Sequence, residues 1–166
     1  MKKSLLIFIL LQSLNVFCQD SLEIDKNWTK LKHQLKLRTE ITLELTKQLQ
    51  KSKKIDKVEL QNAELYAKEL KLICENNVLN KSKVDLTKEK NGELTTSLTH
   101  TLVNLEFDTK LKNKEETQSL IDQLLMIETQ LCIETNKYNK SCKEYNKEEL
   151  IFDIQCENEP PKVTNE

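Results

Sequence analysis

The sequence predicts an all-α fold, an antiparallel up-down-up-down bundle of four long helices. The 166 residues include one glycine, Gly92, and two prolines, Pro160 and Pro161, so little between the N-terminal segment and the tail can break a helix. Leucines recur at steps of three, four and seven along much of the chain, which is the period of an amphipathic helix. The predicted connections are short, and short connections make sequential helices antiparallel neighbours.

Residues 1–18 are a segment of a different kind. Two lysines precede an apolar run over residues 5–11, and polar residues interrupt the apolar character after it. The apolar part is shorter than the roughly 20 residues of a membrane span and is typical of a signal peptide, cleaved before Gln19. An uncleaved, short N-terminal anchor and a lipid attached to Cys18 are the alternatives. Each of these places the rest of the chain outside the cytoplasm, in the periplasm, on the cell surface or secreted.

Residues 19–154 are predicted to form the bundle. The first helix is expected from Asp20, with Glu23 three residues later as a capping partner, to about Ser52. One stripe of this helix carries Trp28, Leu31, Leu35, Arg38, Thr42, Leu45 and Leu49. The second helix is expected to begin within residues 52–56 and to end near Asn76, with Val58, Leu65, Leu72 and Ile73 as its apolar positions. Part of residues 77–90 is predicted to be a connection, because the helical period is lost there.

The third helix is expected from Asn91 to Phe107, with Leu94, Leu98, Leu102 and Leu105 directed inward. After a break at 108–113, the fourth helix is expected to begin near Asn113, which can form a cap with Glu116. Its stripe carries Leu120, Leu124, Ile127, Leu131, Thr135, Tyr138, Cys142 and Tyr145. The two tyrosines are one heptad apart, so each is predicted to bury its ring while its hydroxyl reaches water or a partner at the bundle edge.

Several of these residues carry a resemblance to a known family. "NWTKLKHQLKLRTEITLEL" resembles the first long helix of LemA proteins, with Trp28, Gln34, Leu35 and Arg38 at the family's motif positions. "GELTTSLTHTLVNLE" resembles the third helix of the family through Glu93 and Leu94. The fourth-helix stretch resembles the family through Glu128, next to Thr129, and through its two Tyr-Asn steps, which here are Tyr138-Asn139 and Tyr145-Asn146.

The resemblance covers about residues 25–150 and implies an extracytoplasmic helical domain behind an N-terminal anchor. Two positions depart from the family pattern. Leu43-Glu44 stands where the family has a Pro-Asn step, and Asp108-Thr109 stands where it has a Tyr-Pro step. The biochemical role of LemA proteins is poorly defined, so the resemblance implies a location and a shape more than an activity.

The cysteines offer two interpretations. If Cys18 is removed, an even number remains in an exported chain, which is typical of disulfides. Cys132 and Cys142 are ten residues apart on one predicted helix, about 15 Å, and cannot pair with each other. The proposed topology then favours a bridge from Cys74 to Cys132 and a second from Cys142 to Cys156. The alternative is that all four are buried, unpaired thiols.

The sequence contains no recognisable catalytic or metal-binding motif, so we expect a non-enzymatic protein with no cofactor. His33 and His100 stand alone, and no serine or cysteine has a recognisable base partner. The 26 basic and 27 acidic side chains are intermixed, which gives no basic stripe for nucleic acid. The tail, residues 155–166, is predicted to be flexible.

The leading functional hypothesis is a scaffold or interaction protein of the LemA type, with coiled-coil-like helices and an unknown envelope or membrane protein as partner. Membrane association is expected only through residues 1–18. The alternative hypothesis is a carrier of a small ligand or cofactor, in which Arg38, Thr42 and Thr135 line a polar pocket inside the bundle.

Overall fold

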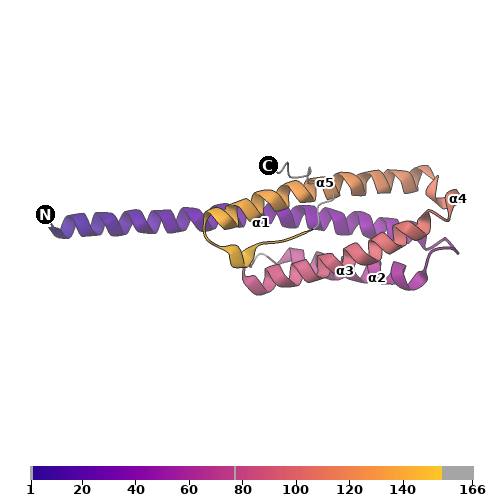
Figure 1. Ribbon diagram of the computed structural model, residues 1–166, viewed down its shortest axis with the longest axis horizontal. Helices are drawn as coiled ribbons and strands as arrows, with labels where there is room; N and C mark the ends of the chain where they lie inside the picture. Colours follow the sequence, from indigo (N-terminus) through magenta and orange to yellow (C-terminus); the bar gives the residue numbers. More distant parts are fainter. Residues whose placement is uncertain (1, 77, 155–166) are drawn as a thin grey trace, which may run out of the picture.

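The computed structural model describes the backbone of residues 2–76 and 78–154, and the side chains of residues 22–76 and 78–154. All regular structure in these residues is helical, and four long helices are joined by short connections (Figure 1). The elements are α1 (Lys2–Leu49), α2 (Lys57–Glu75), α3 (Lys81–Leu105), the short α4 (Thr109–Lys112), α5 (Glu115–Glu144) and the 3-10 turn η1 (Glu148–Leu150). The predicted all-α class with four long helices is therefore confirmed.

Helix α1 is the central element of the bundle. It packs along both α5 and α2, and α3 packs mainly on α2. Glu23 accepts a hydrogen bond from the hydroxyl of Tyr145 at the end of α5, whereas Gln48 near the end of α1 contacts Glu116 at the start of α5. Figure 1 shows α1 continuing beyond the other helices toward the N-terminus. Because α1 begins at Lys2, the predicted helix start at Asp20 is wrong.

The buried faces of α1 and α5 match the predicted stripes. Every stripe residue of α1 from Trp28 to Leu49 is buried, including the polar Arg38 and Thr42. In α5, Leu120, Leu124, Leu131, Thr135, Tyr138 and Cys142 are buried, while Ile127 and Tyr145 are half-buried. The inward leucines of α3 are confirmed as well, with Leu102 half-buried and the other three buried.

The predicted apolar face of α2 is wrong. Val58, Leu65 and Leu72 are 62%, 50% and 67% exposed, and the fourth predicted position, Ile73, is half-buried. The buried residues follow another stripe of the same helix: Leu60, Ala63, Ala67, Leu70 and Cys74. Both stripes have helical spacing, and the one with alanines is buried because small side chains let α2 approach its neighbours closely.

Residues 77–90, part of which was predicted to be a connection, are mostly helix, since α3 begins at Lys81. Asn80 is the N-cap of α3, and its side chain accepts a hydrogen bond from the amide of Lys83. Val84, Thr87 and Asn91 then continue a buried stripe into Leu94, so the helix begins ten residues before the predicted start. Two of these residues are polar, so the helical spacing of the buried positions could not be recognised from apolar residues alone.

The break before the last helix contains α4. Asp108 caps it by accepting a hydrogen bond from the amide of Leu111, and it also accepts one from the hydroxyl of Ser52. Asn113 ends α4, and α5 begins after Lys114, which makes no side-chain cap. The predicted cap of the fourth helix at Asn113 is therefore wrong by one position.

The core is divided into two hydrophobic clusters along the bundle. The first contains Trp28, Leu35, Leu70, Leu94, Tyr138 and Phe152, and the second contains Leu45, Leu49, Leu60, Leu105 and Leu124. Within the described residues, no helix is both long and apolar enough to cross a membrane.

Candidate functional site

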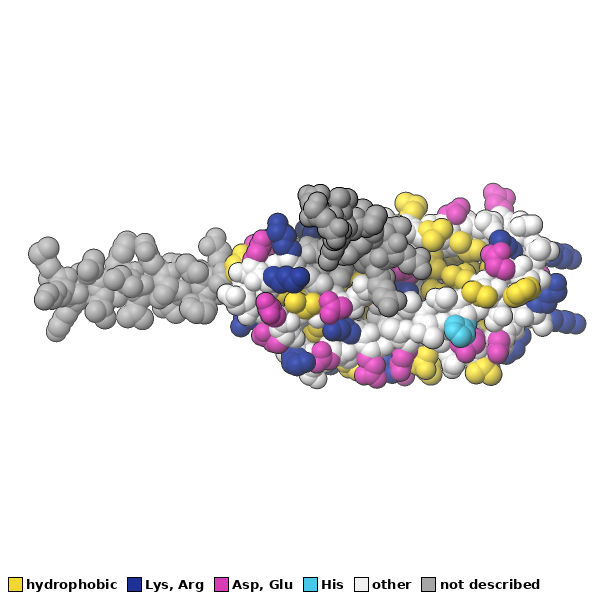
Figure 2. All heavy atoms as spheres, viewed as in Figure 1, with side chains coloured by type: hydrophobic (Ala, Val, Ile, Leu, Met, Phe, Trp, Pro, Cys, Tyr) yellow, Lys and Arg dark blue, Asp and Glu magenta, His cyan; other side chains and the backbone are white. Residues whose placement is uncertain are grey.

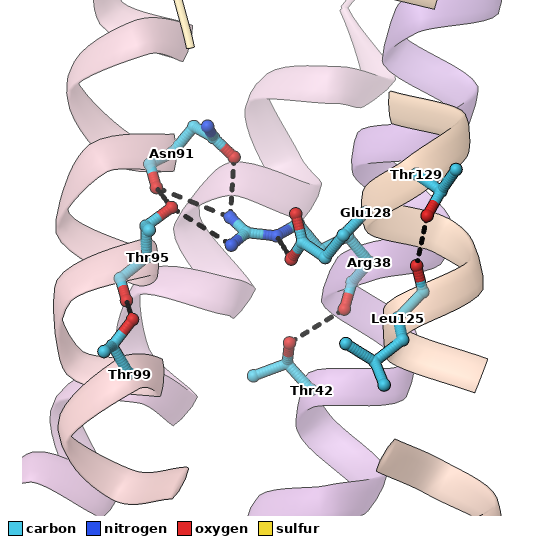
Figure 3. A network of polar contacts seen from close by, with 8 residues as sticks. All are labelled: Arg38, Thr42, Asn91, Thr95, Thr99, Leu125, Glu128 and Thr129. Carbon is cyan, nitrogen blue, oxygen red and sulfur yellow. Dashed lines mark hydrogen bonds and ion pairs between the residues drawn. The ribbon is translucent and has the colours of Figure 1, made fainter. Parts of the chain in front are cut away.

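Arg38 lies on α1 between the two core clusters and reaches both α3 and α5. Its Nε donates to Glu128 Oε1 on α5 at 2.6 Å, and its other nitrogens donate to Asn91 Oδ1 at 2.7 Å and Thr95 Oγ1 at 3.0 Å on α3. Figure 3 shows the guanidinium stretched between these two helices. We call Arg38, Asn91, Thr95 and Glu128 the arginine clasp. It joins three helices through one side chain.

The clasp neutralises a charge that would otherwise be costly to bury. The Arg38 side chain is 3% exposed, whereas that of Glu128 is 37% exposed. An unpaired guanidinium at this depth would be strongly unfavourable, and here its donors are satisfied by the Glu128 carboxylate, the Asn91 amide oxygen and the Thr95 hydroxyl. Thr42, one turn along α1, donates its hydroxyl to the carbonyl of Arg38 at 2.8 Å. The guanidinium is therefore held by protein groups on each of its three nitrogens.

A second group of predicted residues holds the segment that follows α5. We call residues 150–154 the strap. The Asn139 side chain accepts a hydrogen bond from the Phe152 amide at 2.8 Å and donates to the Phe152 carbonyl at 2.9 Å. The Tyr138 hydroxyl donates to the Leu150 carbonyl at 2.9 Å. The first Tyr-Asn step is thus a clamp for the strap.

The strap also has an apolar anchor. The Phe152 ring is fully buried, and its centroid lies 6.1 Å from that of Trp28, which in turn lies 5.2 Å from the ring of Tyr138. On the α3 side, Lys88 forms an ion pair with Asp153 at 3.8 Å. Burial is the main cause that raises the pKa of Tyr138, so its hydroxyl stays protonated and keeps donating.

The second Tyr-Asn step ends α5. Asn146 has a φ of 54°, in the left-handed region that asparagine tolerates better than most residues. The Lys147 amide bonds the Cys142 carbonyl at 2.7 Å, and the Asn146 amide bonds the Lys143 carbonyl at 3.2 Å, which together form a Schellman cap. The chain turns here into η1 and the strap. The two asparagines are therefore explained by chain geometry, and the sequence alone did not show this.

The cysteines differ from the predicted pairing. Cys74 and Cys142 are free and buried, so the predicted bridges from Cys74 to Cys132 and from Cys142 to Cys156 are wrong. The physical reason for the first is that α2 and α5 pack on α1 and make no extensive contact with each other. Cys132 is disulfide-bonded, so the alternative of four unpaired thiols is wrong as well. Cys156 lies outside the described residues.

Two titratable groups lie near the end of α2. Burial raises the pKa of the Cys74 thiol to about 12, against an ordinary value of 9.0. The buried Lys32 donates from Nζ to the Asn76 carbonyl at 2.7 Å, and desolvation lowers its pKa. Cys74 is thus an inert structural thiol, because the thiolate is the nucleophile.

The remaining predicted residues lie outside the arginine clasp and the strap. Leu35 and Leu94 are buried in the first core cluster, and Gln34 is half-buried. Glu93 forms an ion pair with Lys90 at 2.8 Å. Thr135 is buried on α5, seven residues from Glu128 in sequence, and its Oγ1 has no hydrogen-bond partner among the described residues. It is not part of the arginine clasp, so Arg38, Thr42 and Thr135 do not form a single group.

Sequence reasoning missed Asn91, Thr95 and Phe152. Asn91 lies on the buried stripe of α3 three residues before Leu94, a spacing that could have revealed it. Phe152 lies in the short apolar stretch that follows the end of α5, which is the only signal of its burial. Among the described residues, no group of three or more His, Cys, Asp or Glu side chains is placed to hold a metal ion.

The model of the LemA family matches residues 27–155. This range contains the arginine clasp and the strap. No curated protein matches the chain.

Proposed function

This chain belongs to the LemA family, and we propose that it is a non-catalytic interaction protein that works outside the cytoplasm as a helical scaffold in the cell envelope. Export through residues 1–18 and the up-down-up-down order of the helices are parts of this proposal. The bundle presents its outer helix faces, and its partner is another envelope protein.

The observation that carries the proposal is the outer face of α2. Val58, Leu65 and Leu72 are seven residues apart and all are half or more exposed. Residues at this spacing lie on one side of a helix, about 10 Å apart along its axis. We call these three residues the α2 stripe. Large exposed apolar side chains in a row are typical of an interaction surface rather than of a solvated face.

The seven-residue spacing also indicates the chemistry of the partner. An amphipathic helix with its own heptad repeat places apolar side chains at the same interval, so it can pack along the α2 stripe. Charges of both signs flank the stripe, with Glu64 and Lys68 paired at 2.6 Å and Lys71 paired with Glu40 at 3.2 Å. Figure 2 shows the same mixture of signs over the visible face of the bundle. This arrangement suits a helix of mixed charge and does not favour nucleic acid.

The arginine clasp supports a scaffold over a ligand carrier. A carrier that uses Arg38 needs guanidinium donors that are free to bind the ligand. Here Nε and both terminal nitrogens already donate to Glu128, Asn91 and Thr95. The carrier hypothesis therefore has no observation in its favour at this position.

A photoreactive side chain at position 65 of the full-length protein, expressed in its own cells, tests the proposal. We expect one adduct of defined mass, since a partner helix packs against the α2 stripe, and we expect Leu72→Lys to abolish it. The matched control is the same probe at Leu125, which is 60% exposed on α5 and lies off the stripe. Circular dichroism of each variant shows whether the bundle is intact.

The proposal fails if position 65 gives no adduct, or if Leu72→Lys leaves the adduct unchanged. An adduct with twice the mass of the chain would identify a second copy as the occupant, which also contradicts an envelope partner.

Export is tested separately by the intact mass of the protein from the cytoplasmic, the membrane and the soluble extracytoplasmic fractions. A chain that begins at Gln19 in the soluble fraction is the expected result. A full-length chain found only in the cytoplasmic fraction would contradict an extracytoplasmic scaffold.

A further inference from the structure

We propose that the groove between α3 and α5 that holds the strap is a binding site for an extended segment of a partner protein, and that the strap occupies this groove when no partner is bound. The strap contacts Tyr138 and Asn139 on α5, Lys88 on α3 and Trp28 on α1. Figure 1 shows the segment after η1 running between α5 and α3. None of these four residues is on α2, so this site is independent of the α2 stripe.

The groove binds the main chain of the strap. The Tyr138 hydroxyl donates to a strap carbonyl, and the Asn139 side chain accepts from the amide of Phe152 and donates to its carbonyl. Lys88 Nζ lies 3.5 Å from the Ile151 carbonyl. Hydrogen bonds to main-chain atoms do not depend on the side chains of the bound segment, which is how many proteins bind extended peptides. Another extended segment would therefore satisfy the same groups.

The side chains of the strap indicate which segments fit the groove. The Phe152 ring is fully buried beside Trp28, whereas the next side chain, Asp153, is 76% exposed. Leu150 and Ile154, two residues to either side of the ring, are half-buried. Alternate side chains of an extended chain point to the same side. The partner segment that fits thus has a central aromatic residue and an apolar residue at the second position on each side of it.

The helices hold the groove open without help from the strap. Helices α3 and α5 make no extensive contact with each other, because α3 packs on α2 and α5 packs on α1. The arginine clasp also fixes their separation, since Arg38 bonds both. The strap belongs to no helix and follows the turn at Asn146. Its departure therefore leaves the walls in place, and a partner segment competes only with the attached strap, whose effective concentration is on the order of millimolar.

A peptide with the sequence of residues 148–154, EELIFDI, tests whether the groove binds a segment that is not attached to the chain. The peptide is titrated into full-length Phe152→Ala, and the emission of Trp28, the only tryptophan of the chain, reports occupancy. We expect a shift to shorter wavelength and binding at least tenfold tighter than to the unmodified protein. Adding Asn139→Ala should weaken binding at least tenfold, whereas adding Asn136→Ala, on the exposed face of α5, should not change it.

The proposal is overturned if Phe152→Ala binds the peptide no more tightly than the unmodified protein does. It is also overturned if a peptide with alanine in place of its phenylalanine binds equally well. Circular dichroism shows whether Phe152→Ala is folded. If it is not, Phe152→Leu takes its place under the same two criteria, because it keeps an apolar side chain in the core while weakening the attachment of the strap.

A photoreactive side chain at position 88, beside the strap, identifies the source of the natural segment. In the full-length protein in its own cells, reaction with the chain's own strap gives a product with the mass of one chain, whereas a partner gives a heavier adduct. We expect a heavier adduct whose yield rises at least threefold in Phe152→Ala. An adduct of twice the chain mass would identify the strap of a second copy as the occupant, and products of one chain mass alone would identify the chain's own strap. Either result contradicts a partner protein.

Discussion

At the scale of single residues, Arg38 makes the contacts whose loss should cost most. Arg38→Leu leaves Asn91 and Thr95 without their donor and Glu128 without its counter-ion. Removing one partner of a fully buried ion pair costs about 3–5 kcal/mol, and we expect about 2–4 kcal/mol because Glu128 can reach water. Arg38→Lys should recover only part of this, since an ammonium cannot reproduce the fork. Urea unfolding measures each value.

The control for this prediction is Lys68→Ala, which breaks the exposed pair with Glu64 and should change the free energy of unfolding by less than about 0.5 kcal/mol. An Arg38→Leu variant as stable as the unmodified protein would show that the clasp does not hold the three helices together.

Cys74 gives a prediction at alkaline pH. Its pKa of about 12 in the folded protein is above the ordinary value of 9.0, so only the unfolded chain ionises between these two pH values. The contribution of the neutral thiol to stability is therefore complete below pH 9 and is lost as the pH rises from 9 to 12. The loss is at most about 1.4 kcal/mol per pH unit.

The measurement is the free energy of unfolding at pH 8, 9, 10 and 11 for the unmodified protein and for Cys74→Ala. We expect the difference between the two to fall above pH 9. Val84→Ala, a buried substitution without a titratable group, should keep a constant difference across the same range. A constant difference for Cys74→Ala would contradict a raised pKa.

At the scale of helices, the cap of α5 depends on the left-handed conformation of Asn146. The left-handed conformation is unfavourable for alanine by about 1–2 kcal/mol because its Cβ approaches the following carbonyl, whereas glycine adopts this conformation freely. We expect Asn146→Ala to destabilise the protein by about 1 kcal/mol and Asn146→Gly to be nearly neutral in urea unfolding. Asn136→Ala, on the exposed face of the same helix, is the matched control and should not destabilise. Equal stabilities for the alanine and glycine variants at 146 would contradict this explanation of the second Tyr-Asn step.

The helices also show what the sequence can predict. The stripes of α1 and α5 were predicted because each helix has one dominant apolar face. Helix α2 has two faces with helical spacing, and only packing against α1 and α3 decides that the alanine-containing face is buried. The start of α3 was missed because Thr87 and Asn91 occupy buried positions. Arg38 and Glu128 were identified as motif residues, but their contact depends on how three helices pack together.

At the scale of the whole molecule, the division of the core into two clusters suggests that the two ends of the bundle have separate stabilities. The arginine clasp lies between the clusters, and the strap contacts only the first of them. Proteins open locally in cooperative units, and the exchange of backbone amides reports the free energy of each opening. We expect the polar layer at the clasp to separate two such units, because no apolar packing continues through it. Phe152 is the residue that tests this, because it belongs to the first cluster and lies far from the second.

We expect Phe152→Ala to destabilise the first cluster by about 3–5 kcal/mol, through the cavity it leaves beside Trp28 and Tyr138. Amides of α1 near Leu31 and of α5 near Tyr138 should then exchange faster, while those near Leu49 and Leu105 change much less. Leu105→Ala, in the second cluster, should give the reverse pattern. If both variants accelerate exchange equally at the two ends, the bundle is one cooperative unit and the arginine clasp couples its ends. In that case the clasp would make the two clusters unfold together instead of separately. The reason is that its contacts join three helices, so a loss of stability in one cluster would also destabilise the other.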